Sequence, residues 1–184
     1  MVNASQTGEQ LDENGAGNFI VYADFNCPFC YALNERLHAM NLDHRVEFRA
    51  VQHAPTSSSS DNGFEILREL TSEVAELRSR APSITVNVPL FRPNSAAAAA
   101  LVNAVNDNDS VKAGLLRRQV YRALWVDGQD ISSPEVLNGL LQELEIEPPA
   151  PNDLRDDELI AWQTEWDSSP EFDRNIPVLI NGSG

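Results

Sequence analysis

The sequence is short of cationic residues, of cysteines and of long apolar runs, and these shortages exclude several classes of protein. Among its 184 residues, 13 are Lys or Arg and 28 are Asp or Glu, which gives a net charge of −15. Such a chain offers no basic face to nucleic acid or to an anionic membrane surface. No run approaches the roughly 18 apolar residues that a membrane helix needs. The sequence therefore predicts neither nucleic-acid nor membrane partners.

The N-terminal end carries no targeting signal that we can identify. Residues 1–18 are polar and acidic, without a basic start, an apolar core or a small-residue cleavage site. We therefore expect residues 1–17 to form a disordered lead and the protein to be cytoplasmic. In that reducing compartment, a lone pair of cysteines is typical of catalysis or redox sensing rather than of a structural disulfide.

The only two cysteines lie together in Cys27-Pro28-Phe29-Cys30. The motif follows a β-branched and aromatic run, residues 19–25, and precedes a helical pattern, which is the context in which CxxC indicates thiol-disulfide chemistry. Cys27 falls at the start of the predicted helix, where the helix dipole and unpaired N–H groups lower the pKa of a thiol. Cys30 lies one turn further on, and we expect it to point inward and to be less exposed.

Other polar residues allow several interpretations. A zinc site needs four ligands, and none of His38, His44 and His53 has ligand spacing to the cysteines, so we expect no metal and no cofactor beyond the redox-active disulfide. Asp24 serves either as a proton acceptor or as a hydrogen-bonding residue that holds the turn before Cys27. His53 follows the second predicted strand, from which it could approach the rim of the site.

The rest of the pattern predicts a β-α-β unit, a long helical segment and a final strand. Residues 45–52 alternate apolar and polar side chains and complete a crossover between two parallel strands. Helices are expected near residues 63–80, 96–105, 109–125 and 134–144, and residues 153–168 predict one further helix or two short ones. Pro177 opens a last apolar run, in the position where a strand tolerates proline.

The stretch from Asp24 to Tyr31 resembles the active site of DsbA-like thiol-disulfide oxidoreductases of the thioredoxin superfamily, in particular the FrnE-like branch. Residues 92–95 and 130–137 are also similar to this branch. The resemblance implies an α/β fold of thioredoxin type with a large inserted all-helical domain. Here the boundaries would be 18–56 and 171–184 for the thioredoxin-like part and 57–170 for the helical insertion.

The resemblance also implies roles for individual residues. Cys27 would be the nucleophile, Cys30 the resolving thiol, and Pro177 a cis-proline beside the sulfurs, with the backbone of Ile176 available to pair with a bound peptide. The residues that would support the motif are Asp24, Pro28, Phe29 and Tyr31. The implied partners are protein or small-molecule thiols and disulfides, glutathione among them.

Three departures from the family pattern keep other functions open. Pro-Phe between the cysteines leaves the redox direction undetermined, and Val21 replaces the buried acid of many thioredoxins. The sequence ends four residues after Ile180, where the family continues with a strand and a helix, so we expect a truncation or a link to another domain, or a sheet edge covered by a second copy in a homodimer. The alternative functions are a redox-sensing or peptide-binding module of a larger protein, and a kappa-type glutathione-linked transferase or isomerase.

Overall fold

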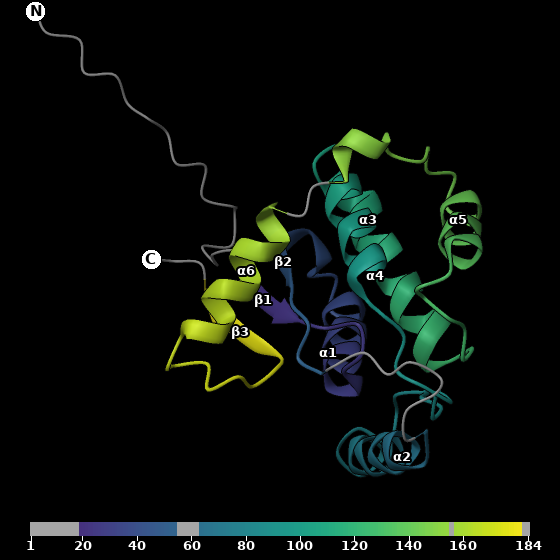
Figure 1. Cartoon of the computed structure of the whole chain (residues 1–184), viewed down its shortest axis with the longest axis vertical. Helices are drawn as coiled ribbons and strands as arrows, with labels where there is room; N and C mark the ends of the chain where they lie inside the picture. Colours follow the sequence, from purple (N-terminus) through teal and green to yellow (C-terminus); the bar gives the residue numbers. More distant parts are fainter. Residues whose placement is uncertain (1–18, 55–62, 155–156, 182–184) are drawn as a thin grey trace, which may run out of the picture.

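A three-stranded sheet forms the centre of the computed structural model, with strand order β2-β1-β3 (Figure 1). The structure describes residues 19–54, 63–154 and 157–181, so the predicted lead, residues 1–17, lies outside the described residues. Strand β1 (Phe19–Ala23) pairs in parallel with β2 (Val46–Ala50) and antiparallel with β3 (Val178–Asn181). Because the register places Ala23 opposite Ala50, the two parallel strands end side by side.

Helix α1 (Pro28–Ala39) and the short 3-10 helix η1 (Asp43–Arg45) connect the parallel strands, so the predicted β-α-β unit is confirmed. Pro28 occupies the first turn of α1, where a missing N–H costs no hydrogen bond. The helix ends before Asn41, whose positive φ of 56° lets the Leu42 N–H reach the carbonyl of Leu37 at 2.9 Å.

The predicted helical segment is also confirmed, with boundaries close to those expected. Its elements are α2 (Gly63–Arg80), α3 (Ala96–Asn106), α4 (Ser110–Trp125), α5 (Pro134–Glu143), the 3-10 helix η2 (Pro151–Asp153) and α6 (Asp157–Ser168). Side chains of Asp109 and Ser133 cap α4 and α5 by accepting from backbone N–H groups of the first turn. No helix in the described part of the chain is long and apolar enough to span a bilayer.

The two faces of β1 contact different sets of helices. Val21 and Ala23 belong to the main hydrophobic core with residues of α1, α3 and α4, whereas Tyr22 packs with Val51 and with Trp166 of α6. This division follows from the alternation of side chains along a strand. Figure 1 shows α6 beside the three strands. Helix α6 was expected within the insertion, and the structure places it against the sheet.

Helix α4 joins the sheet and α1 to the helical segment. Its buried Arg117 donates through Nε to Asn34 Oδ1 at 2.8 Å and lies over the ring of Phe48, 5.1 Å from the ring centroid. Glu35 of α1 accepts from Arg118 at 2.8 Å and from Arg122 at 3.2 Å. These contacts fix α4 against the helix that begins at the cysteine motif.

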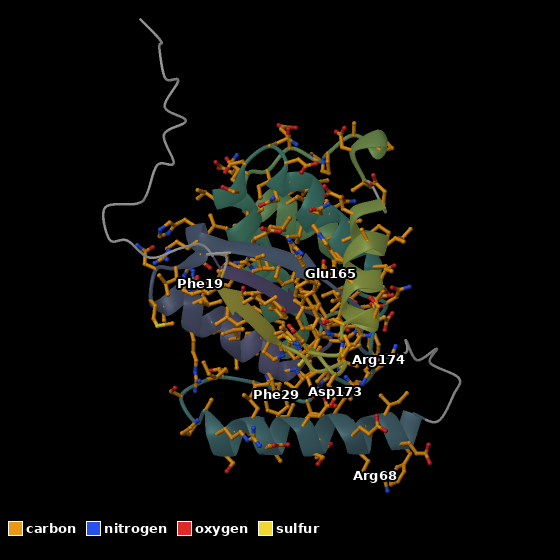
Figure 2. All side chains as sticks on the ribbon, turned by 90° about the vertical axis from the view of Figure 1, so that its left-hand side faces the viewer. Phe19, Phe29, Arg68, Glu165, Asp173 and Arg174 are labelled. Atoms are coloured by element: carbon orange, nitrogen blue, oxygen red, sulfur yellow. The ribbon has the colours of Figure 1, made fainter. Side chains whose placement is uncertain are left out.

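Helix α2 lies at one end of the molecule, next to α1 (Figure 2). It buries Leu70, Val74 and Leu77, while the labelled Arg68 points away from the rest of the molecule (Figure 2). The guanidinium of Arg80, in its last turn, lies 5.9 Å from the ring centroid of Phe29. Helix α2 is therefore in contact with the residue that separates Pro28 from Cys30.

Candidate active site

Cys27 is the N-cap residue of α1, and its sulfur takes the place of the usual capping oxygen. The backbone N–H of Cys30 donates to Cys27 Sγ at 3.4 Å, within the looser range that applies to sulfur. Both cysteines are free thiols in this structure and both are buried, Cys27 at 3% and Cys30 at 2% exposure. Cys30 is the less exposed of the two, as expected, but the difference is small because both sulfurs lie in the same hydrophobic cluster.

The two thiols differ in acidity. Burial raises the pKa of Cys27, but hydrogen bonds from the Cys30 thiol and backbone N–H and the charge of His53 outweigh it, so the pKa lies below its usual value. Burial raises the pKa of Cys30 well above its usual value, and the adjacent Cys27 sulfur adds to this effect. Cys27 is therefore the thiol that ionises first.

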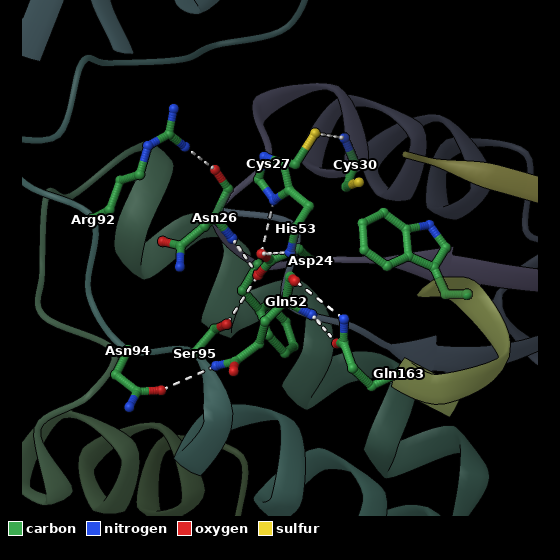
Figure 3. Close-up of polar contacts among 12 residues, drawn as sticks. Asp24, Asn26, Cys27, Cys30, Gln52, His53, Arg92, Asn94, Ser95 and Gln163 are labelled. Carbon is green, nitrogen blue, oxygen red and sulfur yellow. Dashed lines mark hydrogen bonds and ion pairs between the residues drawn. The ribbon is translucent and has the colours of Figure 1, made fainter. Parts of the chain in front are cut away.

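Asp24 connects the ends of three elements at the site (Figure 3). Its buried carboxylate accepts through Oδ1 from the Asn26 N–H at 3.0 Å and from the Ser95 hydroxyl at 2.9 Å. Oδ2 accepts from the His53 N–H at 3.0 Å and contacts His53 Nδ1 at 2.8 Å. Four donors thus hold one carboxylate, which fixes the turn after β1 to the residues after β2 and before α3.

The carbonyl groups of the turn before Cys27 are held by distant side chains. The Tyr121 hydroxyl donates to the carbonyl of Asp24 at 3.3 Å, and Trp125 Nε1 donates to that of Phe25 at 2.8 Å. Arg92 donates to the carbonyl of Asn26 at 2.9 Å. The helical segment therefore sets the backbone geometry from which Cys27 projects.

Replacement of Trp125 by phenylalanine tests this support. We expect Trp125→Phe to lower the free energy of unfolding by about 1–3 kcal/mol, because a buried carbonyl loses its donor while most of the apolar volume stays. Urea denaturation measures the effect. Trp162→Phe, at a half-buried position of α6, is the matched control. An equal loss in both variants would show that the hydrogen bond to Phe25 contributes nothing specific.

The other residues expected to support the motif lie around it. Pro28 is buried and Phe29 half-buried in the first turn of α1. Tyr31 is buried and donates its hydroxyl to the carbonyl of Thr85 at 2.8 Å, and burial raises its pKa to about 12. Tyr31 thus ties α1 to the segment after α2 and keeps its proton at neutral pH.

The segment before β3 carries the expected proline. The peptide bond between Ile176 and Pro177 is cis. Ile176 is half-buried and packs against both hydrophobic clusters, one of which contains Cys27 and Cys30. The structure thus brings this segment to the core that surrounds the thiols, and the peptide-binding role of Ile176 stays a prediction.

An apolar cavity of about 360 Å³ lies between the end of β2, the start of α3 and α6, and its lining includes Gln52 and Gln163. Gln163 Oε1 accepts from the Gln52 N–H at 2.8 Å, and Gln52 Nε2 donates to Asn94 at 3.1 Å. Figure 3 shows Gln163 on the side of Asp24 away from Arg92. His53, the residue after Gln52, does not line this cavity.

The sequence placed His53 only near the rim and predicted no contact with the cysteine turn for Arg92, Tyr121 or Trp125. A usable signal existed for His53. Asp24 follows β1 directly and His53 comes three residues after the end of β2, and side chains at the carboxyl ends of adjacent parallel strands meet at one edge of a sheet. The three residues that hold the turn carry no comparable signal, because they lie 66 to 100 positions away in sequence.

Comparison with known proteins agrees with this geometry. The family model described as DSBA-like thioredoxin domain matches residues 19–163, which is most of the chain, so the protein belongs to the DsbA-like thioredoxin family. No curated protein matches the sequence significantly.

Solved structures of low sequence identity share the fold. A candidate protein disulfide isomerase from Nitrosomonas europaea is 15% identical, with a TM-score of 0.67 over 92% of this chain and 86% of its own. The cytosolic disulfide reductase DsbM from Pseudomonas aeruginosa, solved with GSH, is 18% identical, with a TM-score of 0.59 over 88% and 84%. A 2-hydroxychromene-2-carboxylate isomerase is 16% identical, with a TM-score of 0.54 over 90% and 86%.

Proposed function

We propose that this protein is a thiol-disulfide oxidoreductase that exchanges disulfides through Cys27 and Cys30. The observation that carries the proposal is the unequal acidity of two adjacent thiols at the start of α1, one with a lowered and one with a raised pKa. Membership of the DsbA-like family supports it. Exchange needs a thiolate for attack and a second thiol that stays protonated until its turn.

In the reductive direction, the Cys27 thiolate attacks a substrate disulfide, and a mixed disulfide forms as one substrate thiolate leaves. Cys30 then loses its proton and attacks Cys27, which closes the Cys27–Cys30 disulfide and releases the second substrate thiolate. Two electrons pass from the enzyme to the substrate. The same steps in reverse oxidise a dithiol, and the direction depends on the relative reduction potentials of enzyme and partner.

For partners we propose protein or small-molecule thiols and disulfides, with glutathione as the first to test, since the similar DsbM was solved with GSH. The segment at Ile176 and Pro177 is proposed to contact the bound substrate. A cytoplasmic location remains a prediction, as does a homodimer formed through the sheet edge. The redox-sensing or peptide-binding module of a larger protein also remains an open alternative.

Equilibration with glutathione tests the proposed function. We expect the two cysteines to form an intramolecular disulfide in one two-electron transition, with a potential between about −270 mV, typical of thioredoxin, and about −120 mV, typical of DsbA. Mass spectrometry after acid quenching and alkylation measures the oxidised fraction at each ratio of reduced to oxidised glutathione. The proposal fails if no ratio produces the Cys27–Cys30 disulfide.

A glutathione-linked isomerase is a second candidate, favoured by the fold shared with the 2-hydroxychromene-2-carboxylate isomerase. Such an enzyme would not need Cys30 as a resolving thiol. Two results together would favour this candidate over the first. Cys30→Ser would keep full activity in a glutathione-dependent isomerisation, and the unmodified protein would show no disulfide exchange.

A further inference from the structure

His53 is held in one orientation by the buried carboxylate of Asp24. The backbone N–H and Nδ1 of His53 both contact Asp24 Oδ2, at 3.0 Å and 2.8 Å. Since Oδ1 already accepts from Asn26 and Ser95, the carboxylate acts as an acceptor throughout, and the proton of this contact belongs to Nδ1. The second ring nitrogen, Nε2, is then the atom that gains and loses a proton.

The imidazole lies between Asp24 and Cys27 in Figure 3. The titratable and charged groups that act on it are Asp24, the Cys27 sulfur and the Arg92 guanidinium. Burial and the charge of Arg92 lower the pKa of His53. The hydrogen bond to Asp24, the charge of Asp24 and the charge of Cys27 raise it. The raising effects are larger, so the pKa lies above its usual value. His53 and Cys27 therefore each favour the charged form of the other.

The other titratable groups near the thiols are unsuited to exchanging protons with them. The carboxylate of Asp24 is occupied by four donors. Tyr121 is fully buried, and burial raises its pKa well above the usual value, so the phenol keeps its proton at neutral pH. His53 combines proximity to Cys27 with a ring nitrogen outside the contact with Asp24, and histidine is the side chain whose unperturbed pKa lies near neutrality.

We propose that His53, oriented by Asp24, carries a proton for Cys27, so that the reduced enzyme holds a Cys27 thiolate beside a His53 imidazolium. This inference rests on the proposed function and names the acid and base of its thiol chemistry. The geometry that carries it is at the ends of two adjacent strands. Buried Asp24 contacts the partly buried ring of His53 there, and buried Cys27 lies beside that ring.

The protons balance in this scheme. The Cys27 thiolate attacks the substrate disulfide, and the leaving thiolate takes the Nε2 proton of His53, which becomes neutral. Neutral His53 then accepts the Cys30 proton as Cys30 attacks Cys27, and it passes that proton to the second substrate thiolate. Two substrate thiols, the enzyme disulfide and a neutral His53 result, and the two protons come from the imidazolium and the Cys30 thiol.

Replacement of His53 by asparagine tests the inference, because asparagine places an N–H near the position of Nδ1 and removes the ionisable ring. We expect the pKa of Cys27 to rise, measured from thiolate absorbance against pH, and the turnover of a disulfide substrate near neutral pH to fall about 100-fold. His38→Asn is the matched control, since His38 Nδ1 contacts Asp43 at 2.8 Å away from the motif, and it should change neither quantity.

The outcomes separate the two proposals. Suppose that the unmodified protein exchanges disulfides, and that His53→Asn shows the same Cys27 pKa and the same dependence of turnover on pH. The role of His53 is then overturned, while the proposed function stands. If the unmodified protein exchanges no disulfide but the titration still shifts in His53→Asn, the proposed function fails and the coupling between His53 and Cys27 is supported. His53→Gln serves as the second variant if His53→Asn does not fold.

Discussion

Replacing Cys27 by serine is expected to abolish disulfide exchange, with a loss of roughly 10³-fold or more in turnover. The serine hydroxyl can still accept the hydrogen bond from the Cys30 N–H, so the helix start should persist. It does not ionise near neutral pH, however, and it forms no mixed disulfide. Reduction of a small disulfide, followed by the absorbance of the released thiol, measures the loss.

Cys30→Ser is the companion variant, with a different expected outcome. Because Cys27 keeps its lowered pKa in part through the Cys30 backbone and the charge of His53, it should still attack the substrate. Without a resolving thiol the mixed disulfide should accumulate, and intact-mass measurement detects it. Retained exchange in Cys27→Ser together with complete loss in Cys30→Ser would reverse the two roles and contradict the proposed mechanism.

Replacing Asp24 by alanine is expected to lower the free energy of unfolding by about 3 kcal/mol or more. The change leaves donors from Asn26, Ser95 and His53 without their acceptor in a buried place. Urea denaturation followed by circular dichroism gives the difference. Glu76→Ala, which breaks an exposed pair with Arg80, is the control and should cost less than about 0.5 kcal/mol.

The loss on removing Asp24 should also depend on pH in a defined direction. The pKa of His53 is raised in the folded protein, so the stabilisation from its pairing with Asp24 is complete below the ordinary histidine pKa and is lost as pH rises through the raised value. The cost of Asp24→Ala should therefore be larger at about pH 5.5 than at about pH 8.5. An equal cost at both values would show that His53 carries no charge in the folded state.

Local patterns along the chain were enough to predict the order of elements. Pro28 after the first apolar run marked the start of α1, and Pro134 after two serines marked the start of α5, because these signals act within one helical turn. The alternation in β2 was equally local, although the strand itself is shorter than expected, Val46–Ala50.

Contacts between distant segments could not be predicted in the same way. The pattern of residues 153–168 indicated a helix but not that Trp166 would pack beside Tyr22 on the sheet. At the site, spacing identified Cys27 and Cys30, but Cys27 is buried in a hydrophobic cluster that includes residues of α2, α3 and α4, far along the chain. The role of Asp24 was left between two alternatives because its donors come from three separate segments.

The turn that ends at Cys27 has a consequence for the biosynthesis of the protein. Its carbonyl groups are held by Arg92, Tyr121 and Trp125, which lie 66, 97 and 100 positions further along the chain. During translation the thiols emerge long before these partners. A nascent chain therefore exposes both cysteines at least until α4 has emerged from the ribosome, because the three side chains that hold the turn before Cys27 are not in place earlier.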